Sequence, residues 1–262
     1  MGEAVLAFPA AAQRGAAQAE DAPFVGPPDP SLAYRALRER VASARAPAFW
    51  PAMPPKPRLS LAERAGLVRI VETIPGACGE IEMSAVMEAM RHAPMGDVVQ
   101  IGVGAGRAAA LFAWLAGRYD IGRMLCVDPW AGGPEADDAL ATFEINLAPL
   151  AQGRLNYVRA TAAEAASRYG AGFQASTEAF GTTTYAGKIA VLHLNIDRVT
   201  TEAGADAWTA RLASAGWVIF DDQEWVFGDG PRRLAEGFQA ANASRIACHF
   251  TAGPAHLIQL KR

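Results

Sequence analysis

The chain is predicted to form an α/β fold: a doubly wound, mostly parallel sheet with an antiparallel C-terminal strand and an N-terminal helical extension. From Asp97 onward, short apolar runs alternate with helical stretches, which is typical of βαβ units around a buried sheet. The last two runs are separated only by Thr251–Pro254. That connection is too short for a crossover helix, so these two strands should pair antiparallel. The runs are Val98–Ile101, Met124–Val127, Leu155–Val158, Ile189–Leu194, Trp217–Phe220, Ile246–Phe250 and Leu257–Leu260.

Three segments are expected along the chain. Residues 1–30 are rich in Ala, Gly and Pro and have little to bury, so they should form a flexible tail. Residues 31–95 should form a helical extension, in which Ser60 and Glu63 are a capping-box pair and a further helix runs from Glu80 to His92. This extension is expected to act as a lid or as an oligomer contact. Residues 96–262 carry the α/β pattern and should be the catalytic domain.

Composition and charge exclude several classes of protein. The net charge is −3, and the longest basic stretches are the pairs Arg232-Arg233 and Lys261-Arg262, so a nucleic-acid-binding face is not expected. No apolar run reaches the length of a membrane span. The three cysteines are widely separated and fit neither a disulfide framework nor a metal-ligand spacing. A reduced, cytoplasmic setting is therefore expected.

A glycine-rich turn follows the first predicted strand. Gly102, Gly104 and Gly106 lie between Ile101 and a helix that begins near Arg107. Glycines at such a turn allow a ligand to approach the backbone at the positive end of a helix. Asp128 ends the next strand, about twenty residues further on, where an acid can hold both hydroxyls of a ribose. Together these features favour a nucleoside-type cofactor.

Each of the two features also has a simpler explanation. The glycines can serve tight packing alone, and Asp128 can be a turn residue before Pro129. The spacing is G-x-G-x-G, whereas dinucleotide binding favours G-x-G-x-x-G or G-x-G-x-x-A. Ala108 gives partial overlap with that second pattern. A nicotinamide-dependent oxidoreductase is thus the second enzyme class to consider, although Arg107 departs from its pattern and no Tyr-x-x-x-Lys pair is present.

The stretch from Gly96 to Arg107 resembles the first motif of class I methyltransferases, which have a Rossmann-like fold, and Val127–Trp130 resembles their second motif. The resemblance implies S-adenosylmethionine as cofactor, with the three glycines along its methionine part and Asp128 on its ribose. Trp130 would flank the adenine, or else be a core or surface aromatic. The segment from Thr161 to Glu164, and Ala162 within it, would contact the adenine. The implied cofactor-binding residues are Gln100, Gly102, Gly104, Gly106, Asp128, Trp130 and Ala162; Gln100 stands where an acid is common.

Two later strands end in polar residues, His193-Leu194-Asn195-Ile196-Asp197 and Phe220-Asp221-Asp222. In open α/β sheets, ligands bind at the carboxyl ends of strands. Strand alternation would place His193, Asn195 and Asp197 on one face if the extended conformation persists. Adjacent carboxylates are costly to bury unless a cation or a hydrogen-bond network compensates.

The pattern from residue 96 to 260 resembles the macrocin O-methyltransferase-like family and related sugar methyltransferases. Their Asp-x-Asp after the fourth strand corresponds here to Asn195-Ile196-Asp197, and their Asp-Asp after the fifth to Asp221-Asp222. The resemblance implies a Mg²⁺ site formed by Asn195, Asp221 and Asp222. The family's first Asp is Asn195 here, and an amide can ligate a metal ion but cannot accept a proton as a carboxylate does. Proton removal then falls to His193, Asp197 or Asp222, and His193 can also be a core histidine.

The resemblance predicts an S-adenosylmethionine-dependent O-methyltransferase that acts on a hydroxyl of a sugar or glycosylated substrate, with Mg²⁺ assistance. Its partners would be a small-molecule or saccharide acceptor and further copies of the chain in a homo-oligomer. Gln100 and Asn195 also suggest a non-enzymatic alternative, a methyltransferase-like binding protein that has lost catalysis.

Overall fold

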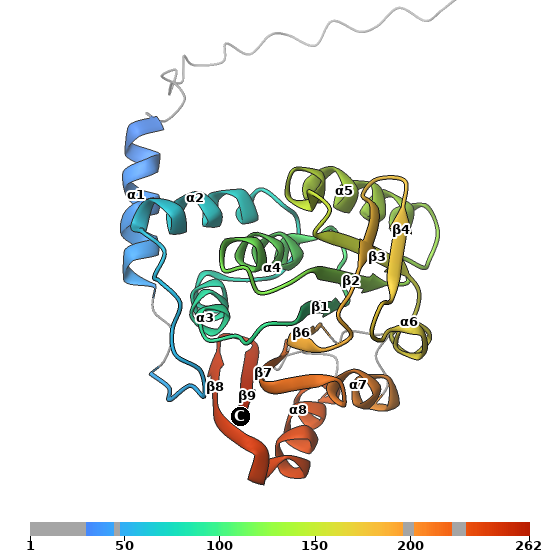
Figure 1. Ribbon diagram of the computed structural model, residues 1–262. Helices are drawn as coiled ribbons and strands as arrows, with labels where there is room; N and C mark the ends of the chain where they lie inside the picture. Colours follow the sequence, from blue (N-terminus) through green and yellow to red (C-terminus); the bar gives the residue numbers. More distant parts are fainter. Residues whose placement is uncertain (1–29, 45–47, 196–201, 222–228) are drawn as a thin grey trace, which may run out of the picture.

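A computed structural model of the protein describes residues 30–44, 48–195, 202–221 and 229–262. A seven-stranded sheet in the order β3-β2-β1-β6-β7-β9-β8 lies between two layers of helices (Figure 1). Strands β1 (Asp97–Ile101), β2 (Met124–Asp128), β3 (Leu155–Arg159), β6 (Ile189–Leu194) and β7 (Leu212–Phe220) are parallel. Strands β8 (Ile246–Ala252) and β9 (Ala255–Leu260) pair antiparallel, and β9 is also antiparallel to β7. The predicted fold class is confirmed: β9 runs opposite to the five parallel strands, and β8, which is antiparallel to β9, runs in their direction.

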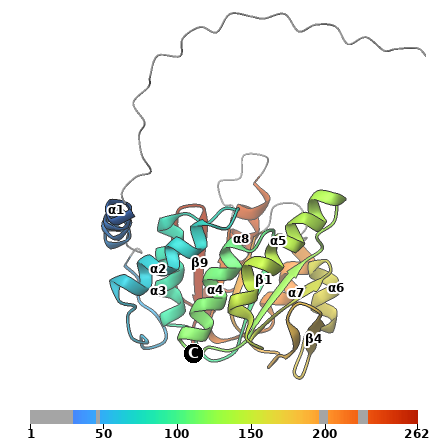
Figure 2. The ribbon, with the colours of Figure 1, turned by 90° about the horizontal axis from the view of Figure 1, so that it is seen from above.

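Successive residues along each central strand face opposite layers, which creates two separate cores. Val98, Val191 and Ile219 belong to the core under α2 (Leu61–Glu72), α3 (Glu80–Arg91), α4 (Arg107–Arg118) and α5 (Pro134–Ala151). Val99, Leu192 and Val218 belong to the core under α6 (Ala162–Arg168), α7 (Glu202–Thr209) and α8 (Gly230–Ala241). Figure 2 shows α2 to α5 side by side on their face of the sheet. Because side chains alternate along a strand, a residue's position in the strand decides which layer of helices it packs against.

The helical extension is joined to the catalytic domain through a shared core. Helix α1 (Pro30–Ser43) packs against α2, which begins at the predicted capping box of Ser60 and Glu63. Helix α3 buries Met83, Val86 and Met90 in the same cluster as Val98 of β1 and Leu111 of α4. The segment that precedes the sheet is thus part of the wall of the larger core. Its action as a lid or oligomer contact stays a prediction.

The structure adds two features to the predicted elements. A small antiparallel hairpin of β4 (Gln174–Thr177) and β5 (Gly181–Thr184) precedes β6, and a short 3-10 turn, η1 (Ala243–Arg245), precedes β8. The hairpin residues are mostly Thr, Ser and Gln, so an apolar run does not mark them. Its position is fixed by a buried amide, since Asn156 of β3 donates to the carbonyl oxygens of Ala175 and Gly181 at 2.9 and 2.8 Å.

Candidate active site

The glycine loop joins the end of β1 to the start of α4, and its three glycines differ in what surrounds them. At Gly102 (φ +77°) an added Cβ would lie 2.4 Å from the carbonyl oxygen of Asn195, and at Gly106 (φ +93°) it would lie 2.5 Å from the side chain of Leu147. Gly104 (φ +53°) has no atom within 4 Å of an added Cβ. Packing therefore demands glycine at 102 and 106, and Gly104 lies beside open space where a ligand can approach.

Asp128 organises this loop from the end of β2. Its Oδ2 accepts hydrogen bonds from the backbone N–H groups of Val103 and Gly104 at 2.7 and 3.0 Å, and its Oδ1 accepts one from Trp130 N–H at 2.8 Å. The carboxylate is half-buried. A carboxylate offers about four lone-pair directions, so one acceptor position is still available for a ribose hydroxyl. Asp128 therefore forms the turn, and its contact with a ribose stays a prediction.

Trp130 is a core aromatic that also supports the loop. Its indole N–H donates to the carbonyl oxygen of Gly104 at 3.0 Å, and its ring lies 5.3 Å from Phe143 and 5.4 Å from Tyr157. Its side chain is buried, and its φ of +38° is unusual for a bulky residue. Contact with adenine stays a prediction for Trp130, as it does for Ala162, the buried first residue of α6.

Gln100 stabilises the start of the loop from inside the sheet. Its Nε2 donates to the carbonyl oxygen of Gly102 at 3.0 Å, and its side chain is fully buried. Its Oε1 has no hydrogen-bond partner within the described residues. Gln100 is the register partner of His193 on β6, so the first motif and the polar end of β6 lie on adjacent strands.

The ends of β1, β6 and β7 form one polar edge. Asn195 N–H donates to the Ile101 carbonyl at 2.9 Å, and Asp221 N–H donates to the Leu194 carbonyl at 2.9 Å. These bonds continue the strand ladders past the last assigned residues, so Asn195 and Asp221 follow the strands directly beside the glycine loop. The Oδ1 atom of Asn195 is buried without a hydrogen-bond partner in the part of the chain that the structure describes. Asp197 and Asp222 lie outside the described residues.

A buried cluster of Glu82, His193 and Asp221 lies beneath this edge. One ligand-type atom from each residue lies within 4.8 Å of those from the other two, and His193 Nε2 is 3.6 Å from Asp221 Oδ2. The three residues are 1%, 0% and 2% exposed. Phe112 of α4 covers the imidazole with a ring-to-ring distance of 5.0 Å. His193 and Asp221 were predicted site residues, whereas Glu82 was not.

Burial and electrostatics perturb this cluster. Burial raises the pKa of Glu82 to about 7, the Asp221 carboxylate acts in the same direction, and His193 opposes it. Burial also raises the pKa of the Cys78 thiol, and Glu82 and Asp221 raise it further. The sequence does hold a signal for Glu82: it is spaced three, four and seven residues from Ala85, Val86 and Ala89, all buried on α3. An acid on an apolar helix stripe is a candidate functional group.

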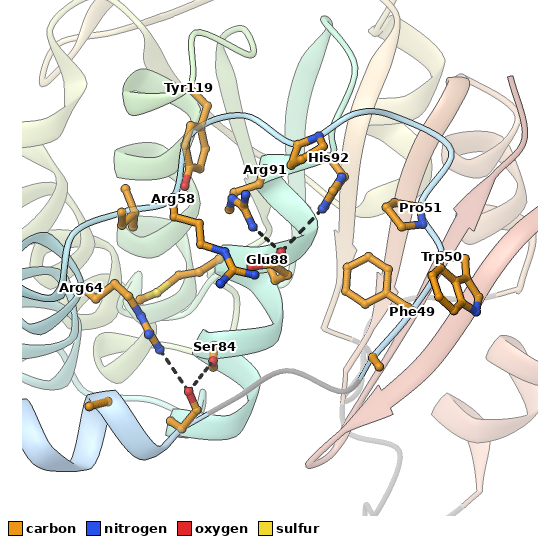
Figure 3. Close-up of a pocket in the computed structure, with 16 residues that line it drawn as sticks. Phe49, Trp50, Pro51, Arg58, Arg64, Ser84, Glu88, Arg91, His92 and Tyr119 are labelled. Atoms are coloured by element: carbon orange, nitrogen blue, oxygen red, sulfur yellow. Dashed lines mark hydrogen bonds and ion pairs between the residues drawn. The ribbon is translucent and has the colours of Figure 1, made fainter.

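A separate pocket of about 760 Å³ lies on the outer side of α3, near Arg91, His92 and Tyr119. Tyr119 follows the last residue of α4, whereas the glycine loop precedes its first, so this pocket is at the opposite end of that helix. Figure 3 shows Arg64 and Ser84 directed at the same carbonyl oxygen, that of Ala44. Arg91 is paired with Glu88. These side chains hold the extension in place, and the pocket is separate from the glycine loop.

Comparison with known proteins agrees with this geometry. Residues 99–223 match a family model described as a methyltransferase domain. A search of curated proteins finds no match to the chain. Within the described residues, no helix is long and apolar enough to cross a membrane.

Three solved structures have a similar fold. The O-methyltransferase TomG from Streptomyces achromogenes, solved with S-adenosylmethionine, has 10% identity and a TM-score of 0.50, covering 75% of this chain and 90% of that one. CalS11, a TDP-rhamnose 3'-O-methyltransferase, has 14% identity and a TM-score of 0.47, with coverage of 89% and 95%. The O-methyltransferase NovP has 15% identity and a TM-score of 0.45, with coverage of 89% and 100%. Residues 99–223 are a methyltransferase domain, and the chain is an S-adenosylmethionine-dependent methyltransferase.

Proposed function

We propose that the chain transfers the methyl group of S-adenosylmethionine to a hydroxyl oxygen of a sugar or glycosylated small molecule. The observation that carries this proposal is the proximity of the glycine loop to the polar strand ends, where Gly102 touches the backbone of Asn195 and Asp221 follows on the next strand. A methyl donor in the loop would then face a polar acceptor site. CalS11, whose name describes methylation of a TDP-bound rhamnose, is a relative in fold with such an acceptor.

The cofactor would be held by residues that the glycine loop and β2 already position. Gly104 would allow the methionine part to approach the backbone, and the remaining acceptor position of Asp128 would take a ribose hydroxyl. Gln100 would keep Gly102 in place, and Gly106 would allow α4 to start close to α5. Trp130 and Ala162 would border the adenine.

The reaction requires an in-line transfer. The sulfonium carbon–sulfur bond breaks as the carbon–oxygen bond forms, and the acceptor hydroxyl loses its proton to a base. A sugar hydroxyl is a weak nucleophile, so a positioned base or a divalent cation is needed to assist it. Asp197 and Asp222 are the proposed bases. His193 is fully buried against Asp221, so we assign it the role of orienting Asp221.

The residues present fit a Mg²⁺ ion. Asn195 has a buried Oδ1 atom with no hydrogen-bond partner in the described segments. Asp221 follows the neighbouring strand, where its N–H donates to the Leu194 carbonyl, and contributes a carboxylate. Both are oxygen ligands of the kind that Mg²⁺ prefers. Asn195, Asp221 and Asp222 would hold the ion, which would lower the pKa of a bound acceptor hydroxyl. Two acidic residues and one neutral amide should bind it more weakly than three carboxylates.

A methyl-transfer assay with a panel of acceptors tests the proposal. Purified protein, S-adenosylmethionine and Mg²⁺ are incubated with nucleoside-diphosphate sugars, glycosylated phenols, free catechols and amines, and products are read by mass spectrometry. The proposal expects one added methyl group on glycosylated acceptors and its loss in Asp221→Asn. Methylation of catechols or amines alone would contradict the sugar assignment. Tight cofactor binding with no product from any acceptor would favour the binding-protein alternative.

We also propose that the protein is located in the cytoplasm. Cys78, Cys126 and Cys248 are free thiols in the structure, two of them buried. Reduced thiols fit the cytoplasm, where nucleotide-activated sugars and S-adenosylmethionine would both be available to the enzyme.

A further inference from the structure

The Glu82–His193–Asp221 cluster is a second candidate site, distinct from the Mg²⁺ ligands proposed above except for Asp221. Glu82 comes from α3 in the N-terminal extension, His193 from β6 and Asp221 from the end of β7. Both carboxylate oxygens of Glu82 and both ring nitrogens of His193 are buried and lack hydrogen-bond partners among the residues that the structure describes. Two buried residues therefore direct unsatisfied polar atoms at one point.

Burying these polar groups without a ligand is energetically unfavourable. A carboxylate removed from water without a compensating hydrogen bond or charge is strongly destabilising, and here two carboxylates approach each other. His193 can offset only one of them, and only when it is protonated. The surroundings on this face are mostly apolar, since Phe112, Met83 and Ile219 belong to the same core. The Cys78 thiol and the Gly79 backbone N–H act favourably on the Glu82 carboxylate, but less strongly than burial acts against it.

The spacing suits a small cation. The ligand atoms of the three residues all lie within 4.8 Å of one another, so an ion between them can reach each atom at about 2.0–2.2 Å after small side-chain movements. Two carboxylates and a neutral imidazole would balance a charge of about +2. The ion would also satisfy the polar atoms of Glu82 and His193 that have no hydrogen-bond partner among the described residues.

We propose that Glu82, His193 and Asp221 bind a divalent first-row transition-metal ion of the Zn²⁺ or Co²⁺ class. An imidazole ligand favours such ions over Mg²⁺, which prefers oxygen ligands and retains water. The ion would tie the N-terminal extension to the strands that carry the acceptor edge. It would also fix the orientation of Asp221, whose carboxylate the proposed methyl-acceptor site uses.

Co²⁺ binding to the full-length, tag-free protein tests this inference. The protein is dialysed against a chelator and then against Co²⁺, and bound metal is measured by elemental analysis and by the visible absorption of ligated Co²⁺. The expected result is about one Co²⁺ per chain, with affinity reduced at least about tenfold in Glu82→Gln. Glu82→Asp keeps a carboxylate and should bind with intermediate affinity.

Two control variants test whether Co²⁺ binds at the proposed cluster and not elsewhere on the protein. Glu80→Gln makes the same charge change in the same turn of α3, at a side chain paired with Arg40, and should bind Co²⁺ like the wild type. His256→Gln removes one member of the pair His249 and His256, whose ring nitrogens are 3.4 Å apart on β8 and β9, and should also leave binding unchanged. Circular dichroism checks that each variant is folded.

Three results would overturn the inference: no stoichiometric Co²⁺ in the wild type, undiminished binding in a folded Glu82→Gln variant, or loss of binding in His256→Gln. S-adenosylhomocysteine titration in the same samples keeps the proposed function separate. Cofactor binding without Co²⁺ binding would refute only the metal site, whereas Co²⁺ binding without cofactor binding would refute only the methyltransferase assignment of the glycine loop.

Discussion

The glycine loop and the Glu82–His193–Asp221 cluster lie near the same edge of the sheet, but they differ in how far the protein satisfies their polar groups with hydrogen bonds. Asp128 is half-buried and accepts three backbone hydrogen bonds. Glu82 and His193 are fully buried, and their polar atoms have no hydrogen-bond partner within the described chain. The loop is thus organised by the chain itself before any cofactor arrives. The cluster has polar atoms that a bound proton or ligand would satisfy.

The largest expected effect comes from the glycine loop. Gly102→Ala would place a Cβ 2.4 Å from a backbone oxygen in a left-handed conformation, and should destabilise the protein by about 3 kcal/mol or more. Gly104→Ala is the matched control, since its φ of +53° is also left-handed but the space around it is open. It should cost only about 1–2 kcal/mol. Thermal unfolding compares the two, and equal losses would show that packing against Asn195 does not hold the loop.

A second prediction concerns the loop's electrostatics. In Asp128→Asn, one side of the new amide presents N–H groups to backbone N–H donors, so at least one loop hydrogen bond is lost. The cost is about 1–3 kcal/mol, which corresponds to about a tenfold to hundredfold loss in S-adenosylhomocysteine affinity if the loop must be in place to bind it. Calorimetric titration measures the change. Unaltered affinity would separate Asp128 from the cofactor.

The contrast between the two regions follows what the sequence can reveal. The strands of the seven-stranded sheet were predictable because each contains a short apolar run, and the glycine loop because its residues are contiguous. The cluster was not, because its members come from α3, β6 and β7 and meet only when the register of β6 and β7 and the packing of α3 are known. Glu82 follows Glu80 and Ile81 at the start of an ordinary helix, and only its place on the apolar stripe distinguishes it.

The predicted helical extension shows the same limit. Its helices were predictable from the capping box and the apolar spacing, and α2 begins at Ser60 as expected. That α3 would share a core with β1 and α4 depends on packing between segments that are far apart in the sequence. Asp197 and Asp222 lie outside the described residues, so their roles stay predictions.

In the metal-free protein, the cluster should make the free energy of unfolding depend on pH. The folded-state pKa of Glu82, raised to about 7 by burial and Asp221, exceeds its ordinary value of 4.5. A carboxyl group with a raised folded pKa contributes no penalty below pH 4.5, destabilises the fold increasingly between pH 4.5 and about 7, and adds nothing further above that. In the presence of a chelator, Glu82→Gln should therefore gain about 3 kcal/mol over the wild type at pH 8 relative to pH 4.

Chemical denaturation at the two pH values measures this gain. Glu80→Gln provides the control, because its side chain is partly exposed and should show no such difference. A pH-independent gain in Glu82→Gln, or an equal change in Glu80→Gln, would mean that the buried charge of Glu82 is not what destabilises the metal-free protein.

Calorimetric titration of the purified protein with S-adenosylhomocysteine, with NADH as the control ligand, tests the central claim most directly. The account predicts micromolar binding of S-adenosylhomocysteine, weaker binding to Asp128→Asn, and no binding of NADH. Absence of S-adenosylhomocysteine binding by the folded wild type, or binding of NADH in its place, would contradict the assignment of the glycine loop to a methyl donor.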